Sequence, residues 1–108
     1  MSGISAAVAA ARQGADVVLI NDRPVLGGNA SSEIRVTVNG VQTLKAKNPV
    51  ERETGIIEEI LLENKKYNPQ ESYPIWDHVL YDYVVRQPNL RLMLNTQAIK
   101  AIMDGERI

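Results

Sequence analysis

The sequence predicts an α/β fold in which helices pack against parallel strands, and three observations lead to this prediction. Apolar residues recur at helical spacing between Ile4 and Ala11. An unbroken apolar run, Val17 to Ile20, follows directly, and such a run is typical of a strand buried on both faces of a parallel sheet. In the second half of the chain, two segments with apolar residues at helical spacing are followed by segments in which apolar residues alternate, as in strands. A helix that leads straight into a buried strand is one half of a βαβ unit, and the strand expected before the helix is missing.

The composition indicates a globular chain and argues against several classes of function. Of its 108 residues 44% are hydrophobic, so we expect residues 1–108 to form all or part of one domain. Twelve basic and thirteen acidic residues leave a net charge of -1, which argues against nucleic-acid and membrane partners. With no cysteine and one histidine, neither a disulfide framework nor a metal site is expected. We expect a cytoplasmic protein.

The first helix is rich in small side chains, so it can approach a sheet closely. Gly14 is expected to end it in the manner of a glycine just after a helix. The alternative, that Ile4 to Ala11 is the core of a signal peptide, lacks the basic stretch that should precede such a core.

Loop residues follow the strand, with a proline and a glycine pair between Asn21 and Asn29. Residues 34–38 alternate and predict a short strand that ends at Asn39-Gly40. Residues 41–52 show no period, which indicates a surface loop or an insertion.

Two further helices are predicted between residues 54 and 88. Thr54 is expected to cap the first, which ends before Asn68-Pro69, and Pro74 to open the second at its first position. The expected inner face of the first comprises Ile56, Ile57, Ile60, Leu61 and Asn64, and that of the second Trp76, Val79, Leu80, Tyr83 and Val84.

The remaining residues predict strands and a hairpin. Leucines alternate with other residues from Leu90 to Leu94, and a further strand is expected at residues 98–103. Asp104-Gly105 is a hairpin turn signal, and Ile108 stands at the start of the returning strand. From both ends we expect the chain to be a piece of a longer protein.

Two features point to a dinucleotide. Gly3 stands where the third glycine of a GxGxxG motif would open a helix whose N-terminus holds a pyrophosphate. About 20 residues later, where an acid usually binds ribose, the strand ends at Asn21-Asp22.

The loop after this strand carries a resemblance to a known family. With the small-residue helix before it, the stretch Arg23-Pro24-Val25-Leu26-Gly27-Gly28-Asn29 resembles the RPxLGGN-type loop of bacterial FAD-dependent oxidoreductases. Fumarate reductase-like flavoproteins carry a similar Gly-Gly-Asn. Residues 53–59 and 89–96 are also similar to that family, so the likeness extends along most of the chain.

The resemblance implies a partial Rossmann-like FAD-binding domain that lacks its first strand and has a strand and hairpin at its C-terminus. It implies that the glycine pair faces the FAD pyrophosphate, that Asn29, Ser31 and Ser32 supply donors, and that the backbone near Ala98 holds adenine. Asn21 replaces the usual ribose acid, with Asp22 next to it. The implied cofactor-binding residues are Gly3, Asn21, Asp22, Arg23, Gly27, Gly28, Asn29, Ser31, Ser32 and Ala98.

The same resemblance implies a small-molecule substrate and catalytic residues outside this chain. Because the first strand, the first two glycines and a later FAD segment are expected to lie outside it too, the chain alone is expected to bind FAD poorly or not at all. Two other classes stay open: an NAD-type dinucleotide fold, and a non-catalytic remnant that self-associates through the open edge of residues 17–20.

Local alternatives also remain. The glycine pair can be a flexible turn, Asn21-Asp22 a plain strand end, and Ser31-Ser32 a turn cap. Arg35 is either a flavin-side group or a solvated or ion-paired residue, and we favour the latter. His78 lies off the apolar face and is expected to be solvated. Trp76, Tyr81 and Tyr83 are expected to be core and rim residues.

Overall fold

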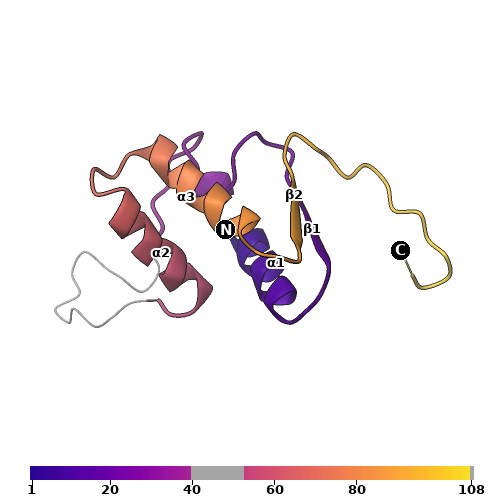
Figure 1. Cartoon of the computed structure of the whole chain (residues 1–108). Coiled ribbons are helices and arrows are strands. Elements are labelled where there is room, and N and C mark those ends of the chain that lie inside the picture. Colours follow the sequence, from indigo (N-terminus) through magenta and orange to yellow (C-terminus); the bar gives the residue numbers. More distant parts are fainter. Residues whose placement is uncertain (40–52, 108) are drawn as a thin grey trace.

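The computed structural model describes residues 1–39 and 53–107. Within these ranges it has three α-helices, a short 3₁₀ helix and two parallel strands, so the predicted α/β class is confirmed (Figure 1). Segment 41–52, which we predicted to be a loop or insertion, lies outside the described residues, as do Gly40 and Ile108. None of the helices in the described ranges is long and apolar enough to cross a membrane.

Helix α1 (Ser2–Arg12) has the predicted inner face. Its buried residues are Ile4, Ala7, Val8 and Ala11. The helix ends as expected, because the Gly14 N–H donates to the Ala11 carbonyl at 3.0 Å and the Ala15 N–H to the Ala10 carbonyl at 3.1 Å. This pair of bonds needs a left-handed residue at position 14, where glycine has a φ of 90°.

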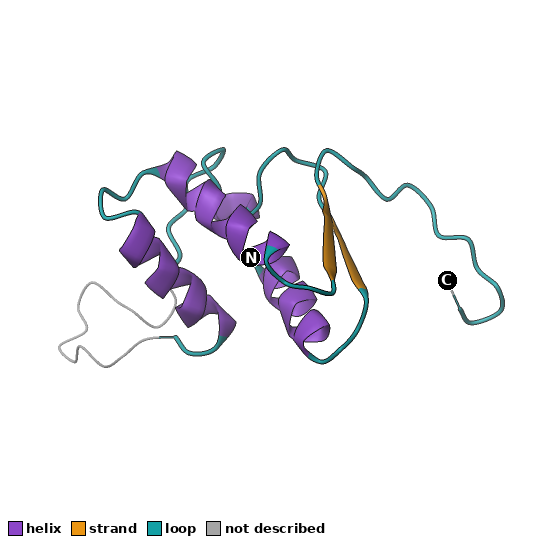
Figure 2. Ribbon diagram, viewed as in Figure 1, coloured by secondary structure: helices purple, strands orange, loops and turns teal. Residues whose placement is uncertain are grey.

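Strand β1 (Val17–Ile20) pairs in parallel with β2 (Leu90–Met93), with Val17 opposite Leu90 and Ile20 opposite Met93 (Figure 2). The two strands are joined through residues 21–89, which include both remaining α-helices. Our expectation that β1 is buried on both faces is wrong, because Val18 and Ile20 are 43% and 44% exposed. Helices cover one face of the sheet, and among the described residues no element covers the other.

Helices α2 (Ile56–Tyr67) and α3 (Tyr73–Val85) pack on each other, and in addition α2 packs on α1 and α3 packs on β2. The whole predicted inner face of α3 is buried, whereas Ile60 is the one fully buried residue of α2. Two predicted helix starts are wrong by one residue. Gly55, not Thr54, precedes α2, and Pro74 stands second in α3 after Tyr73.

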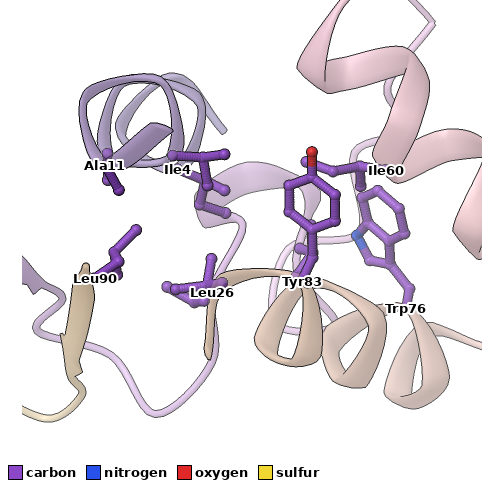
Figure 3. Close-up of a cluster of buried hydrophobic side chains, with 11 residues drawn as sticks. Ile4, Ala11, Leu26, Ile60, Trp76, Tyr83 and Leu90 are labelled. Atoms are coloured by element: carbon purple, nitrogen blue, oxygen red, sulfur yellow. The ribbon is translucent and has the colours of Figure 1, made fainter. Parts of the chain in front are cut away.

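The core joins the helices to the sheet. Figure 3 shows Ile4 and Ala11 of α1 facing Leu26 and Leu90, while Ile60 of α2 lies near Trp76 and Tyr83 of α3. Leu26 belongs to the glycine-rich loop, so that loop is anchored in the core at the residue directly before Gly27.

Two predicted strands are absent. Residues 34–38 are irregular, because Ile34 and Arg35 donate their N–H groups back to the Ser31 carbonyl and Arg35 has a φ of 65°. Residues 98–103 extend away from the body of the molecule (Figure 1), where no described strand pairs with them. Beyond them, the predicted hairpin turn is present as a single antiparallel bridge between Asp104 and Arg107.

Candidate functional site

The segment that follows β1 is folded back on itself by Asn21. The side-chain Nδ2 of Asn21 donates to the carbonyls of Arg23 and Val25, both at 3.0 Å. Its backbone N–H donates to the Met93 carbonyl at 2.9 Å, and its carbonyl accepts from the Thr96 N–H at 3.0 Å. Asn21 therefore holds together the carboxyl ends of β1 and β2.

These bonds give a physical reason for the departure from the usual acid. Two carbonyl oxygens require a donor, which the amide of Asn21 provides and an ionised carboxylate cannot. Asp22, the next residue, is exposed.

Arg23 links the two limbs of the loop. Its Nε lies 3.0 Å from Glu33 Oε2, and this hydrogen bond raises the pKa of the Arg23 guanidinium. The arginine side chain is 57% exposed, so the ion pair contributes little to stability.

The glycine pair lies at the turn of the loop. Gly27 has a φ of 115°, and a Cβ atom there would lie 2.9 Å from Leu80 Cδ1 of α3, so only glycine fits. Gly28 has a φ of 59° and open space where a Cβ would stand. Gly28 begins the 3₁₀ helix η1 (Gly28–Ala30). Because nothing lies where its Cβ would stand, a ligand can approach the Gly28 backbone closely from the solvent side.

Backbone donors are left free at this turn. The Ala30 and Ser31 N–H groups are bonded to the Gly27 and Gly28 carbonyls. The N–H groups of Gly28 and Asn29 have no acceptor among the described residues, and both residues are exposed. Consecutive unpaired N–H groups of this kind form concave sites for anions.

The N-terminus of α1 is adjacent to the loop. The amino group of Met1 lies 3.4 Å from the Gly27 carbonyl oxygen, which brings the first turn of α1 next to the glycine pair. Gly3 is exposed in that turn, and a Cβ atom added to it would meet nothing within 4 Å. The first N–H groups of a helix have no partners inside the helix and carry partial positive charge. Gly3, Gly27, Gly28 and Asn29 are thus brought together.

Ser31 and Ser32 are both at least partly buried, and each is hydrogen-bonded within the protein. Ser31 is fully buried, and its Oγ accepts from the Glu33 N–H at 3.3 Å. This is the turn-capping arrangement that we left open as an alternative. The half-buried Ser32 donates its N–H to Asp77 Oδ1 of α3 at 2.9 Å.

Helix α3 contributes contacts that the sequence analysis missed. Trp76 Nε1 donates to the Ala30 carbonyl at 2.7 Å, and Asp77, which is 9% exposed, accepts from Ser32. One feature of the sequence could have indicated these contacts: Asp77 is an acid on the otherwise apolar face of a helix, and carboxylates are seldom buried without a hydrogen-bonding partner.

The other singled-out residues lie apart from the loop or on its surface. Thr96 reaches Asn21, but Ala98 is exposed in the extended tail, and no hydrogen bond of the described residues ties it to the loop. Arg35 is exposed, donates to the Ser32 carbonyl at 3.0 Å and stacks on Tyr73. His78 is exposed, as expected. No group of three possible metal ligands occurs in the described ranges.

A separate cavity of about 260 Å³ lies between α2, α3 and residues 36–38. Its lining includes Ala30, Leu61, Asn64 and Trp76. None of the ten cofactor-binding residues implied by the resemblance lines this cavity.

A cluster of hydrogen-bonded ionisable side chains lies outside the loop, where the three α-helices meet. Arg12 of α1 makes two hydrogen bonds with Glu59 of α2, at 2.9 and 2.7 Å, and the Tyr83 hydroxyl of α3 donates to Glu59 at 2.6 Å. The bonds from Arg12 and Tyr83 lower the pKa of Glu59 to about 2. Burial, together with the bond to Glu59, raises the pKa of Tyr83 to about 12. The cluster joins the three helices.

Comparison with known proteins gives one match. A family model described as "FAD dependent oxidoreductase" matches residues 1–108, the whole chain. No curated protein and no solved structure matches it.

Proposed function

The chain belongs to the FAD-dependent oxidoreductase family, and we propose that its Gly27–Asn29 loop and the first turn of α1 hold the diphosphate of FAD. The family supports the identity of the cofactor. The single observation that supports this location is the pair of unpaired, exposed N–H groups at Gly28 and Asn29 beside a helix N-terminus.

The residues present fit a diphosphate. An anion needs donors and close approach, and the backbone offers both, because a side chain at Gly28 or Gly3 would point into open space that the ligand can use. Among the described residues, no carboxylate accepts from the Gly28 or Asn29 N–H groups, so no side chain competes with an anion for these donors. When bound, FAD supplies hydride or electron transfer, and the protein supplies binding and orientation.

The ribose contact in this proposal moves from Asn21 to Asp22. The amide nitrogen of Asn21 is already bonded to two carbonyls, whereas the Asp22 carboxylate is exposed beside it. An ionised carboxylate accepts hydroxyl hydrogen bonds strongly. The backbone near Ala98 remains our proposal for the adenine contact, with the family resemblance as its support.

In this proposal Ser31 is no longer a donor to the phosphates, the role that the resemblance implied. Its side chain is buried and accepts from Glu33, so we assign it the shaping of the turn and leave phosphate contact to the backbone of Gly28 and Asn29. The substrate is proposed to be a small molecule, as in the family.

Equilibrium dialysis against FAD, NAD⁺ and ADP tests the function with a matched pair of variants. Gly28→Ala places a methyl group where the phosphate would approach, and we expect it to weaken FAD binding about tenfold, the loss of one contact of about 1.4 kcal/mol. Gly105→Ala is the control, because Gly105 has nearly the same φ, 63°, and equally open surroundings but lies in the tail.

The outcomes separate the candidates. FAD bound more tightly than NAD⁺, with only the Gly28 variant impaired, supports the proposal. Tighter binding of NAD⁺ favours the NAD-type alternative, and equal effects of both variants contradict a diphosphate site at this loop. Because the chain alone is expected to bind FAD weakly, each nucleotide is used well above the concentrations that fill a complete site, and no binding of any of the three at those concentrations also contradicts it.

A further inference from the structure

We propose that Asp77 is a positioning residue that fixes the directions of the free N–H groups in the glycine loop. Its carboxylate lies on the inner face of α3 and is 9% exposed, a costly place for a charge unless it is hydrogen-bonded. Its Oδ1 accepts from the Ser32 N–H at 2.9 Å. The ligand-binding part of this inference rests on the proposed function; the loop-holding part does not.

Three residues of one face of α3 grip the loop on both sides of its exposed turn. Leu80 packs against Gly27 before the turn, while Trp76 and Asp77 bond to Ala30 and Ser32 after it. Trp76 and Asp77 stand four and three residues before Leu80, the two spacings that make side chains neighbours on a helix surface, so the loop is clamped against one side of α3.

The clamp leaves two N–H groups of the loop without an acceptor among the described residues, although the carbonyls of the same two residues accept hydrogen bonds. Between its two ends, Gly28 and Asn29 are exposed with their N–H groups free. Donors that bind an anion well must already point in the right directions before the ligand arrives, since ordering them on binding costs free energy. The clamp supplies this order, and Asp77 holds its downstream end.

Asp77 is the member of the clamp that a substitution can test most cleanly. Among the described residues, Asp77 is the side chain that accepts from the Ser32 N–H. A hydrogen bond to a charged acceptor is stronger than one to a neutral group. Asp77→Ala removes the acceptor, whereas Asp77→Asn keeps a carbonyl oxygen of the same reach.

The first measurement needs no ligand. Backbone amide hydrogen exchange, followed by NMR, is compared among the wild type, Asp77→Ala, Asp77→Asn and the control Asp82→Ala. Asp82 is on the same helix and pairs with Arg86 at 2.9 Å, away from the loop. We expect Asp77→Ala to speed exchange at Ser32 about tenfold or more, with Asp77→Asn restoring most of the protection and Asp82→Ala leaving it unchanged.

The second measurement is the FAD dissociation constant of the same variants. We expect Asp77→Ala to weaken binding about tenfold and Asp77→Asn to bind within about threefold of the wild type. The emission of Trp76, the single tryptophan of the chain, reports on the clamp directly because its Nε1 bonds to Ala30.

Each of the two measurements can contradict a different part of the proposal. Unchanged exchange at Ser32 in Asp77→Ala, or an equal rise across the whole core, overturns the positioning role. If Asp77→Ala does not fold, a failure of Asp77→Asn to protect Ser32 overturns it instead. If the wild type binds no FAD even at concentrations well above those that fill a complete site, the proposed function fails, and the exchange data still decide whether Asp77 holds the loop.

Discussion

At the scale of single residues, the site depends on which atoms are already bonded. Asn21 stands where an acid is usual, and its amide makes two bonds to the loop that only a donor can make. Gly27 and Gly28 both have left-handed backbones, yet for different reasons: Gly27 leaves room for Leu80, and Gly28 leaves room on the outside. The sequence motif marks these positions, but it does not reveal that Asn21 and Ser31 are engaged in shaping the loop.

Asn21→Asp tests the role of the amide at residue 21. A carboxylate there would lose both hydrogen bonds and face two carbonyl oxygens, so we expect the free energy of unfolding to fall by about 1–3 kcal/mol. Urea denaturation measures it. Asp22→Asn, at the exposed neighbouring position, should change stability by less than about 0.5 kcal/mol. An Asn21→Asp variant as stable as the wild type would show that the amide is not needed.

At the scale of elements, helix α3 is both core and platform. Its buried face was predictable, because five apolar residues at helical spacing leave little choice of orientation. Its contacts with the loop were not, because Asp77 lies within the same helical pattern, and periodicity does not show which partner a polar residue meets. The two missing strands have a related cause. Alternation shows only that a segment can pair, and residues 34–38 and 98–103 have no described neighbouring strand.

The joint of the three helices at Glu59 makes a prediction about acid. Because the fold lowers the pKa of Glu59 from its ordinary value of 4.5 to about 2, its contribution is present above about pH 4.5 and is lost as the pH falls toward 2. Its side chain is 45% exposed, so solvent screening limits the contribution to about 1 kcal/mol or less.

Glu59→Gln should therefore be less stable than the wild type at neutral pH, and the difference should shrink between pH 4.5 and 2. Urea denaturation across this range measures the difference. Glu106→Gln, an exposed position in the tail, is the control. A stability gap that stays constant with pH would count against the ionised joint.

At the scale of the whole molecule, the α/β class and the order of the main elements followed from periodicity, and the family match extends over the entire chain. Long-range placement did not follow. The approach of the α1 N-terminus to Gly27 and the cavity beside Trp76 arise from packing among segments distant in sequence. Self-association through the open edge of β1 stays a prediction; among the described residues β1 pairs with β2 alone, which leaves its other edge unpaired.

The most direct test of the diphosphate site is a residue-by-residue map of nucleotide binding. In ¹H–¹⁵N NMR spectra of the chain titrated with ADP, which shares its diphosphate with FAD, we predict the largest shifts at the amides of Gly3, Gly28 and Asn29. Smaller shifts should reach Ala30 and Ser32 through the clamp. Shifts confined to Leu61, Asn64 and the other residues of the separate cavity, with the Gly28 and Asn29 amides unmoved, would contradict a diphosphate site at this loop.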